Sequence, residues 1–155
     1  MKGSYILLIE LPEPRSIPVG SLGSICFSKG YYAYVGSALN GIEARVGRHL
    51  RNNKKTHWHV DYLLQHSTVT KVFIYETAER IECHLSRALS LHFLSVPGFG
   101  SSDCNCRSHL YYVGAEGKKF EDQLPGLSRL LCSCPLPPAS ETRLNVTEPL
   151  AMLLH

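Results

Sequence analysis

The chain has 155 residues and a formal net charge of +3 at pH 7, and 44% of its residues are apolar and 19% are charged. This length and composition fit one soluble globular domain that can bury a core without stabilising metal ions or disulfide bonds. The small net charge does not by itself indicate a nucleic-acid partner. Glu10 and Pro12 interrupt the apolar run near the start, which argues against a signal peptide or membrane span. We therefore expect a cytoplasmic protein whose cysteines are thiols or metal ligands.

Alternating and β-branched apolar residues predict the first strands. Gly3–Leu11 has this pattern and is followed by Pro12 and Pro14. Ile17–Phe27 contains one proline and two glycines, which predicts two short strands joined by a turn. Tyr31–Gly36 is expected to be a central strand.

A helix is predicted over Gly41–Arg51, with Asn40 as its N-cap. A spacing of one turn places Arg45 and His49 together at one edge of the apolar stripe, where they would face neither the core nor bulk water. The stripe itself consists of Ile42, Val46 and Leu50.

The remaining elements are expected in the order helix, strand, helix, strand, over Trp58–Leu64, Val69–Tyr75, Ala78–Phe93 and Ser108–Val113. After Gly114 the periodic pattern decays and prolines accumulate. We therefore expect a folded domain over residues 1–122 and a flexible tail or loosely attached appendage over 123–155. Together the elements predict an α+β domain in which helices flank a small antiparallel central sheet.

Positive charge gathers between residues 44 and 60, where the sequence has five Arg or Lys residues, three His and no acid. Such a cluster attracts phosphate groups, although a solvated helix face is the ordinary alternative. The nucleic-acid contacts expected from this cluster are Arg48, Arg51, Lys54 and Lys55.

Several motifs resemble the signature of the GIY-YIG nuclease superfamily. The segment GSY at 3–5 resembles the first half of the signature, and YVGS at 34–37 resembles the second half. Arg45 and His49 follow the second half at helical spacing. Glu82, near the start of the third helix, occupies the place where the superfamily keeps its metal-binding glutamate.

Within the superfamily, the sequence is most similar to the Uri-like subfamily of small prokaryotic proteins, some of which are fused to endonuclease III. The resemblance covers roughly residues 3–113 and rests on several motifs in the right order. These motifs are YYAYVGSA, RVGRHL, HWHVDYL, IECHL and GFGSSDCNCRSHL.

The resemblance implies hydrolysis of phosphodiester bonds, with DNA as the expected partner and one divalent cation as cofactor. Glu82 would hold Mg²⁺ or Mn²⁺, which prefer carboxylate oxygens, and Arg45 would bind the phosphate through its planar guanidinium. Tyr5 and Tyr34 would present their hydroxyls to the attacking water, one as general base, with Arg45 and the metal favouring the phenolate. His49 is the alternative proton carrier.

The sequence departs from the superfamily pattern in two respects. Tyr5 and Tyr34 are 29 positions apart, so an extra β excursion must fit between the two motifs, at residues 18–27. The late asparagine of the superfamily has no clear counterpart, and Ser102 or Asp103 is a candidate replacement.

Three further polar residues are expected to support the site. His59 and Asp61, in the motif HWHVDYL, are interpreted as residues that orient the active-site helix, while contact with nucleic acid or with the metal stays open. Asp103 is expected to support the site from the loop after the third helix. Trp58 is interpreted as a core residue.

Cysteine and histidine residues form a separate candidate site. Zn²⁺ accepts thiolate and imidazole ligands, and the available ligands are Cys104, Cys106 and His109, with Cys83 and His57 or His59 elsewhere. The spacing is not that of a usual zinc knuckle. A structural Zn²⁺ and ordinary buried thiols beside a hydrogen-bonded histidine are both open.

Each candidate residue also has an ordinary structural interpretation. Tyrosines in strands are usually packing residues, and a glutamate in the first turn of a helix is favoured by the helix dipole. Two other functions therefore compete with the nuclease: a non-catalytic nucleic-acid-binding module with the same fold, and a small zinc-stabilised interaction domain.

Overall fold

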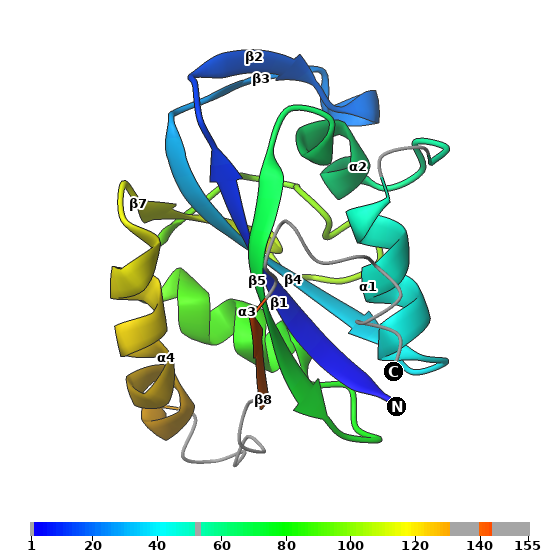
Figure 1. Ribbon diagram of the computed structural model, residues 1–155, viewed down its shortest axis with the longest axis vertical. Helices are drawn as coiled ribbons and strands as arrows, with labels where there is room; N and C mark the ends of the chain where they lie inside the picture. The colour runs from blue at the N-terminus through cyan, green and yellow to red at the C-terminus, as the bar shows by residue number, and fades with distance from the viewer. Residues whose placement is uncertain (1, 52–53, 131–139, 144–155) are drawn as a thin grey trace.

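The computed structural model describes residues 2–51, 54–130 and 140–143 and confirms the predicted α+β class (Figure 1). The described helices are α1 (Ile42–Leu50), α2 (His59–Leu64), α3 (Glu82–Ser90), α4 (Gly117–Leu130) and the 3₁₀ helix η1 (Gly20–Leu22). The described strands are β1 (Gly3–Leu11), β2 (Arg15–Pro18), β3 (Ser24–Phe27), β4 (Gly30–Ala38), β5 (Thr68–Glu76), β6 (Leu94–Ser95), β7 (Leu110–Gly114) and β8 (Ser140–Arg143). The main sheet is antiparallel with the strand order β6-β7-β4-β1-β5-β8, and β2 pairs only with β3.

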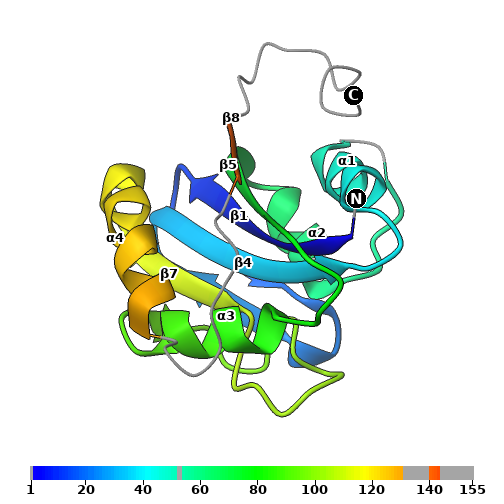
Figure 2. The same cartoon turned by 90° about the horizontal axis from the view of Figure 1, so that it is seen from below.

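Both faces of the main sheet are covered by helices. Helices α1 and α2 lie on one side and α3 and α4 on the other (Figure 1). Figure 2 shows α1 and α4 on opposite sides of the sheet. Strand β1 is therefore apolar along nearly its whole length. Tyr5, Leu7 and Ile9 pack toward α1 and α2, whereas Ile6 and Leu8 pack toward α3 and α4.

The register of β1 against β4 brings the two predicted motif tyrosines together. Tyr5 is paired with Gly36, and Leu7 with Tyr34, so the two tyrosines are diagonal neighbours on the same face of the sheet. The intervening residues form the β2-η1-β3 unit, in which Arg15 pairs with Phe27. The expected extra β excursion is therefore present, and it leaves the β1–β4 pairing intact.

Strand β7 pairs with β4 only over Tyr31–Tyr34. The ladder closes with a hydrogen bond from the Val35 N–H to the carbonyl of His109, 2.9 Å long. Among the described residues, the remainder of β4 has no strand on that side. Side chains from both layers of helices can therefore meet at this end of β4.

The start of α1 differs from the prediction. Gly41 rather than Asn40 is the N-cap, and no side chain caps the helix. Gly41 has φ of 139°, a conformation that favours glycine, and its carbonyl accepts the first helical hydrogen bond, from the N–H of Arg45 at 3.3 Å. The chain enters the helix through this glycine, which leaves the Asn40 side chain without the capping role.

The last part of the described chain contains two elements that the sequence pattern did not predict, α4 and β8. Helix α4 runs across the expected domain boundary at residue 122, and its buried Phe120 and Leu124 pack against the α3 face of the sheet. The prolines that accumulate after Gly114, Pro125 among them, had instead predicted a tail without regular structure. The rest of the predicted tail, 131–139 and 144–155, lies outside the described residues.

Candidate functional site

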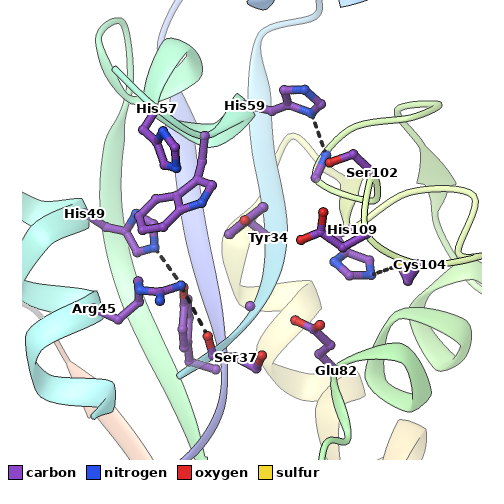
Figure 3. A pocket seen from close by; sticks show the side chains of 15 residues that line it. Tyr34, Ser37, Arg45, His49, His57, His59, Glu82, Ser102, Cys104 and His109 are labelled. Atoms are coloured by element: carbon purple, nitrogen blue, oxygen red, sulfur yellow. Dashed lines mark hydrogen bonds between the residues drawn. The ribbon is translucent and has the colours of Figure 1, made fainter. Parts of the chain in front are cut away.

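A pocket of about 200 Å³ lies at the open end of β4 (Figure 3). Its lining includes all five residues for which the sequence predicted a chemical role: Tyr5, Tyr34, Arg45, His49 and Glu82. They come from β1, β4, α1 and α3, and they are separated by up to 77 positions in the chain. Folding has therefore gathered these side chains around one space.

One side of the pocket, which we call the tyrosine wall, is formed by Tyr5, Tyr34, Arg45 and His49. The Tyr5 hydroxyl and Nε2 of His49 share a hydrogen bond of 2.8 Å. Both residues are buried, with 1% and 3% of their surfaces exposed. The prediction that His49 lies at the edge of the core was wrong, because its ring packs among Tyr5, Tyr34 and Trp58.

Burial sets the protonation of this wall. It lowers the pKa of His49 to about 3, and the nearby Lys54 ammonium acts in the same direction. Burial also raises the pKa of Tyr5 and Tyr34, whereas the Arg45 guanidinium opposes that rise, as the sequence analysis expected, but does not overcome it. At neutral pH the wall therefore holds two neutral phenols and one neutral imidazole.

Gly36 makes the approach of the Tyr5 ring possible. A Cβ at this position would lie 2.5 Å from the hydroxyl oxygen and from Cζ of Tyr5, closer than real Cβ contacts allow. Gly36 is also the cross-strand partner of Tyr5. The glycine of the YVGS motif is therefore needed to seat the phenol in the pocket.

Trp58 contacts both arginines of α1 that face this region. The guanidinium carbon of Arg45 lies 4.4 Å from the centre of the indole, and that of Arg48 lies 4.1 Å from it. Arg45 also donates a long hydrogen bond, 3.5 Å, to the carbonyl of Ser37. Trp58 is part-exposed and lines the pocket, so it acts as a platform for Arg45 as well as packing against the core.

Asp61, predicted to orient the helix that carries Arg45 and His49, joins the start of α2 to α1. Its carboxylate accepts hydrogen bonds from the N–H groups of His57 and Trp58, at 2.8 and 2.9 Å, and from both terminal nitrogens of Arg48, at 3.0 and 2.9 Å. Burial alone would raise the pKa of Asp61, but these donors lower it. Arg48, predicted as a nucleic-acid contact, is thus already engaged as the partner of a buried carboxylate.

The other predicted basic contacts differ in exposure. Arg51 and Lys55 are exposed. Lys54 is half-buried, and its Nζ donates to the carbonyl of His49 at 2.5 Å. Arg51 and Lys54 also line a separate hollow of about 280 Å³. Within the described residues, Arg51 and Lys55 are therefore the members of the predicted set that remain open to a large polyanion.

The opposite side of the pocket, which we call the carboxylate wall, consists of Glu82, Ser102 and Asp103. Figure 3 shows Glu82 directed into the pocket from the start of α3, across from Arg45 and Ser37. Glu82 is part-exposed, and Ser102 and Asp103 are exposed. Ser102 and Asp103, the candidate replacements for the missing asparagine, thus both line the pocket.

His59 joins α2 to the loop that precedes Ser102 and Asp103. Its Nδ1 accepts a hydrogen bond of 2.9 Å from the N–H of Gly100, and its ring packs against Phe99. Burial lowers the pKa of His59. His59, for which a supporting role was predicted, thus holds the loop that leads to Asp103 against α2.

A cysteine and histidine cluster borders the carboxylate wall. The cluster consists of Cys83, Cys104, Cys106 and His109. Each residue offers one ligand atom, and the four atoms lie within 4.8 Å of one another. This cluster could hold a metal ion. Cys83, on α3, provides the fourth ligand atom that the sequence left open between Cys83, His57 and His59. Cys104 and His109 also line the pocket, so the cluster and the pocket share a boundary.

Comparison with known proteins identifies the family of this chain. A family model described as a domain of unknown function, DUF123, matches residues 4–129. The chain belongs to this family. The match spans both walls of the pocket and the cysteine and histidine cluster. No curated protein and no solved structure matches the chain significantly.

The structure also bears on membrane association. Among the residues that the structure describes, no helix has the length and hydrophobicity needed to cross a bilayer.

Proposed function

We propose that this chain is a metal-dependent endonuclease of the GIY-YIG type, related to the Uri-like subfamily, that hydrolyses phosphodiester bonds of DNA. The observation that carries the proposal is the convergence of two phenols, a guanidinium, an imidazole and a carboxylate on one pocket. Hydrolysis of a phosphodiester requires activation of water and stabilisation of charge on the phosphate and on the leaving oxygen. The pocket contains a residue suited to each task.

Glu82 suits Mg²⁺ or Mn²⁺. Its carboxylate is part-exposed in the pocket, and the exposed Asp103 adds a second carboxylate to the same wall. Such hard cations often use one or two protein carboxylates and keep waters as their other ligands. When bound, the cation would neutralise phosphate charge and stabilise the leaving oxygen.

Arg45 would bind the phosphate from the tyrosine wall. Its guanidinium stays charged at any working pH, and its stacking on Trp58 restricts its orientation without occupying all of its hydrogen-bond donors. A contact that strengthens in the transition state typically contributes about 3 kcal/mol, or about a hundredfold in rate.

Tyr5 and His49 would carry the proton from water. With Nδ1 of His49 protonated, its Nε2 can accept the Tyr5 hydroxyl proton while the Tyr5 oxygen takes a proton from water. The low pKa of His49 opposes this transfer in the free protein. A bound phosphate would bring negative charge beside the imidazole and raise that pKa. Tyr34 would orient the water.

The charge distribution supports a nucleic-acid substrate. Arg51 and Lys55 are exposed on the segment that follows the tyrosine wall, where they could contact phosphates outside the pocket. DNA as the substrate and the cytoplasm as the location belong to this proposal. The cluster of three thiols and one imidazole suits Zn²⁺ rather than Mg²⁺, because zinc prefers sulfur and nitrogen ligands.

The experiment is incubation of the purified protein with labelled duplex, single-stranded and branched DNA and with RNA, with and without Mg²⁺ or Mn²⁺. We expect metal-dependent cleavage of DNA by the wild type and a loss of about 10³-fold or more in Glu82→Ala. Glu79→Ala is the matched control, because Glu79 is exposed on the same segment and does not line the pocket.

Two outcomes would contradict the proposal. Cleavage that Glu82→Ala leaves unchanged would remove Glu82 from the mechanism and point to a contaminating nuclease. Binding without cleavage on every substrate would favour the non-catalytic nucleic-acid-binding module.

A further inference from the structure

The ligand atoms of the cysteine and histidine cluster are spaced closely enough for all four to bind one metal ion. Sγ of Cys104 lies 3.4 Å from Nε2 of His109, and the four ligand atoms all lie within 4.8 Å of one another. With Zn–S bonds of about 2.3 Å and Zn–N bonds of about 2.0 Å, a tetrahedral zinc site has S–N edges of roughly 3.5 Å and S–S edges of roughly 3.8 Å. The observed spacing needs only a small contraction around an ion.

The ligands come from two segments of the chain. Cys83 is the second residue of α3, whereas Cys104, Cys106 and His109 lie in the loop before β7. A hydrogen bond of 2.6 Å from the Ser86 hydroxyl to the carbonyl of Ser108 already joins the end of this loop to α3. The middle of the loop lies against the first turn of α3, where the thiols of Cys104 and Cys106 lie within 4.8 Å of the Cys83 thiol.

The order of residues along the chain connects this cluster to the carboxylate wall. Glu82 immediately precedes Cys83, and Asp103 immediately precedes Cys104. An ion that fixes these two cysteines would therefore fix the backbone of both carboxylates. Cys104 and His109 contribute to both the cluster and the pocket lining, so the distance between the two sites is small.

We propose that Cys83, Cys104, Cys106 and His109 bind one structural Zn²⁺ that positions Glu82 and Asp103, and thereby sets the affinity of the pocket for its second cation. This positioning role rests on the proposed function, whereas the zinc site does not. Four protein ligands leave no open coordination position, which is the pattern of structural rather than catalytic zinc. The zinc site acts on the pocket through the neighbouring residues, much as outer-shell contacts tune a metal ligand.

The first measurement is the zinc content of the full-length protein, purified with reducing agent and without chelator. We expect one zinc per chain by elemental analysis and loss of zinc in Cys106→Ser. Cys106 is the variant of choice because it belongs to the cluster but does not line the pocket. Cys26→Ser is the control, since Cys26 is an exposed thiol in β3 and its replacement should leave the zinc content unchanged.

The second measurement is Mn²⁺ binding in the absence of DNA, followed by the electron paramagnetic resonance signal of free Mn²⁺. We expect Cys106→Ser to weaken Mn²⁺ binding about 10- to 100-fold, the range seen when supporting contacts of a metal ligand are removed. Glu82→Ala should weaken Mn²⁺ binding but retain zinc. Cys106→His keeps four ligands and should restore both zinc and Mn²⁺ binding.

The outcomes separate this inference from the nuclease proposal. A folded wild-type protein without zinc, after growth with zinc supplied, would overturn the zinc site. Zinc bound in the wild type but Mn²⁺ affinity unchanged in a folded, zinc-free Cys106→Ser would overturn the positioning role. A protein that binds zinc and Mn²⁺ as expected but cleaves no nucleic acid would overturn the nuclease proposal and leave the metal site standing.

Discussion

The two walls of the pocket are built in different ways. On the tyrosine wall, the reactive side chains are buried in the core and held by ring contacts and by the Tyr5–His49 hydrogen bond. On the carboxylate wall, Glu82 is part-exposed and Asp103 is exposed on a loop. The first wall is fixed by packing, whereas the second lies on a short helix and a loop, with the cysteine and histidine cluster beside it.

In the proposed endonuclease, this difference would divide the work of the site between the two walls. Groups that orient water and phosphate benefit from rigid placement, because small displacements cost large factors in rate. A site for a hydrated cation must instead stay open to exchange with solvent. The tyrosine wall should therefore tolerate few substitutions, and the carboxylate wall should respond mainly to changes in metal content.

The largest effect on stability is expected at the ion pair between Arg48 of α1 and Asp61 of α2. Arg48→Ala would leave the carboxylate of Asp61, which is 1% exposed, without its bidentate partner. Breaking such a pair costs about 3 kcal/mol in the free energy of unfolding. Urea unfolding measures the loss, and Arg51→Ala, one turn further on and exposed, is the control. Equal stabilities of the two variants would show that Arg48 is an ordinary surface cation.

Gly36→Ala tests whether the tyrosine wall is fixed by packing. The new methyl group would collide with the Tyr5 phenol, and we expect the cleavage rate to fall about a hundredfold. In a Tyr5→Phe background, the same change should cost much less, because the hydroxyl that it displaces is already absent. Equal losses in both backgrounds would mean that the effect of Gly36→Ala does not depend on the Tyr5 hydroxyl.

The buried imidazole predicts a pH dependence of stability. The pKa of His49 is about 3 in the folded protein and about 6.5 in an unfolded chain. Between these values only the unfolded chain gains the proton, so the free energy of unfolding falls as the pH drops, by roughly 2 kcal/mol at about pH 5.

His49→Gln isolates this effect, because it removes the titrating group and leaves all other histidines in place. Urea unfolding at about pH 7.5 and about pH 5 should show a smaller difference for the variant than for the wild type. The same pH response in both proteins would contradict the assignment of a neutral, buried His49.

The smallest effect is expected outside both walls. Arg51→Ala should weaken DNA binding only a few-fold and lower the slope of log affinity against log salt concentration by about 1. Fluorescence anisotropy over a series of salt concentrations measures this slope, and Lys29→Ala, on the turn before β4, is the control. An unchanged slope would mean that Arg51 does not contact the DNA.

Short-range patterns predicted the central part of the fold well. Strands β1 and β4 follow from alternating apolar residues, and α1 from the apolar stripe around Val46. Helix α4 was missed because Pro125 and Gly126 interrupt its local pattern, while its buried Phe120 is held by tertiary contacts. Local sequence signals do not contain those contacts.

The same limit applies to the site. The residues of the tyrosine wall occur in motifs with recognisable spacing, so they could be named from sequence. The bidentate contact between Arg48 and Asp61 could not, since a cationic run gives no sign of which arginine is engaged. Cys83 as the fourth member of the cluster likewise depends on the packing of α3 against a distant loop.

The most direct test is a crystal structure of the protein with Mn²⁺ and a short DNA whose scissile position carries a non-hydrolysable linkage. We expect anomalous scattering from one Mn²⁺ beside Glu82, with the adjacent phosphate against Arg45 and within reach of the Tyr5 and Tyr34 hydroxyls. DNA bound along Arg51 and Lys55 with its phosphates outside the pocket, and Mn²⁺ remote from Glu82, would contradict the nuclease proposal.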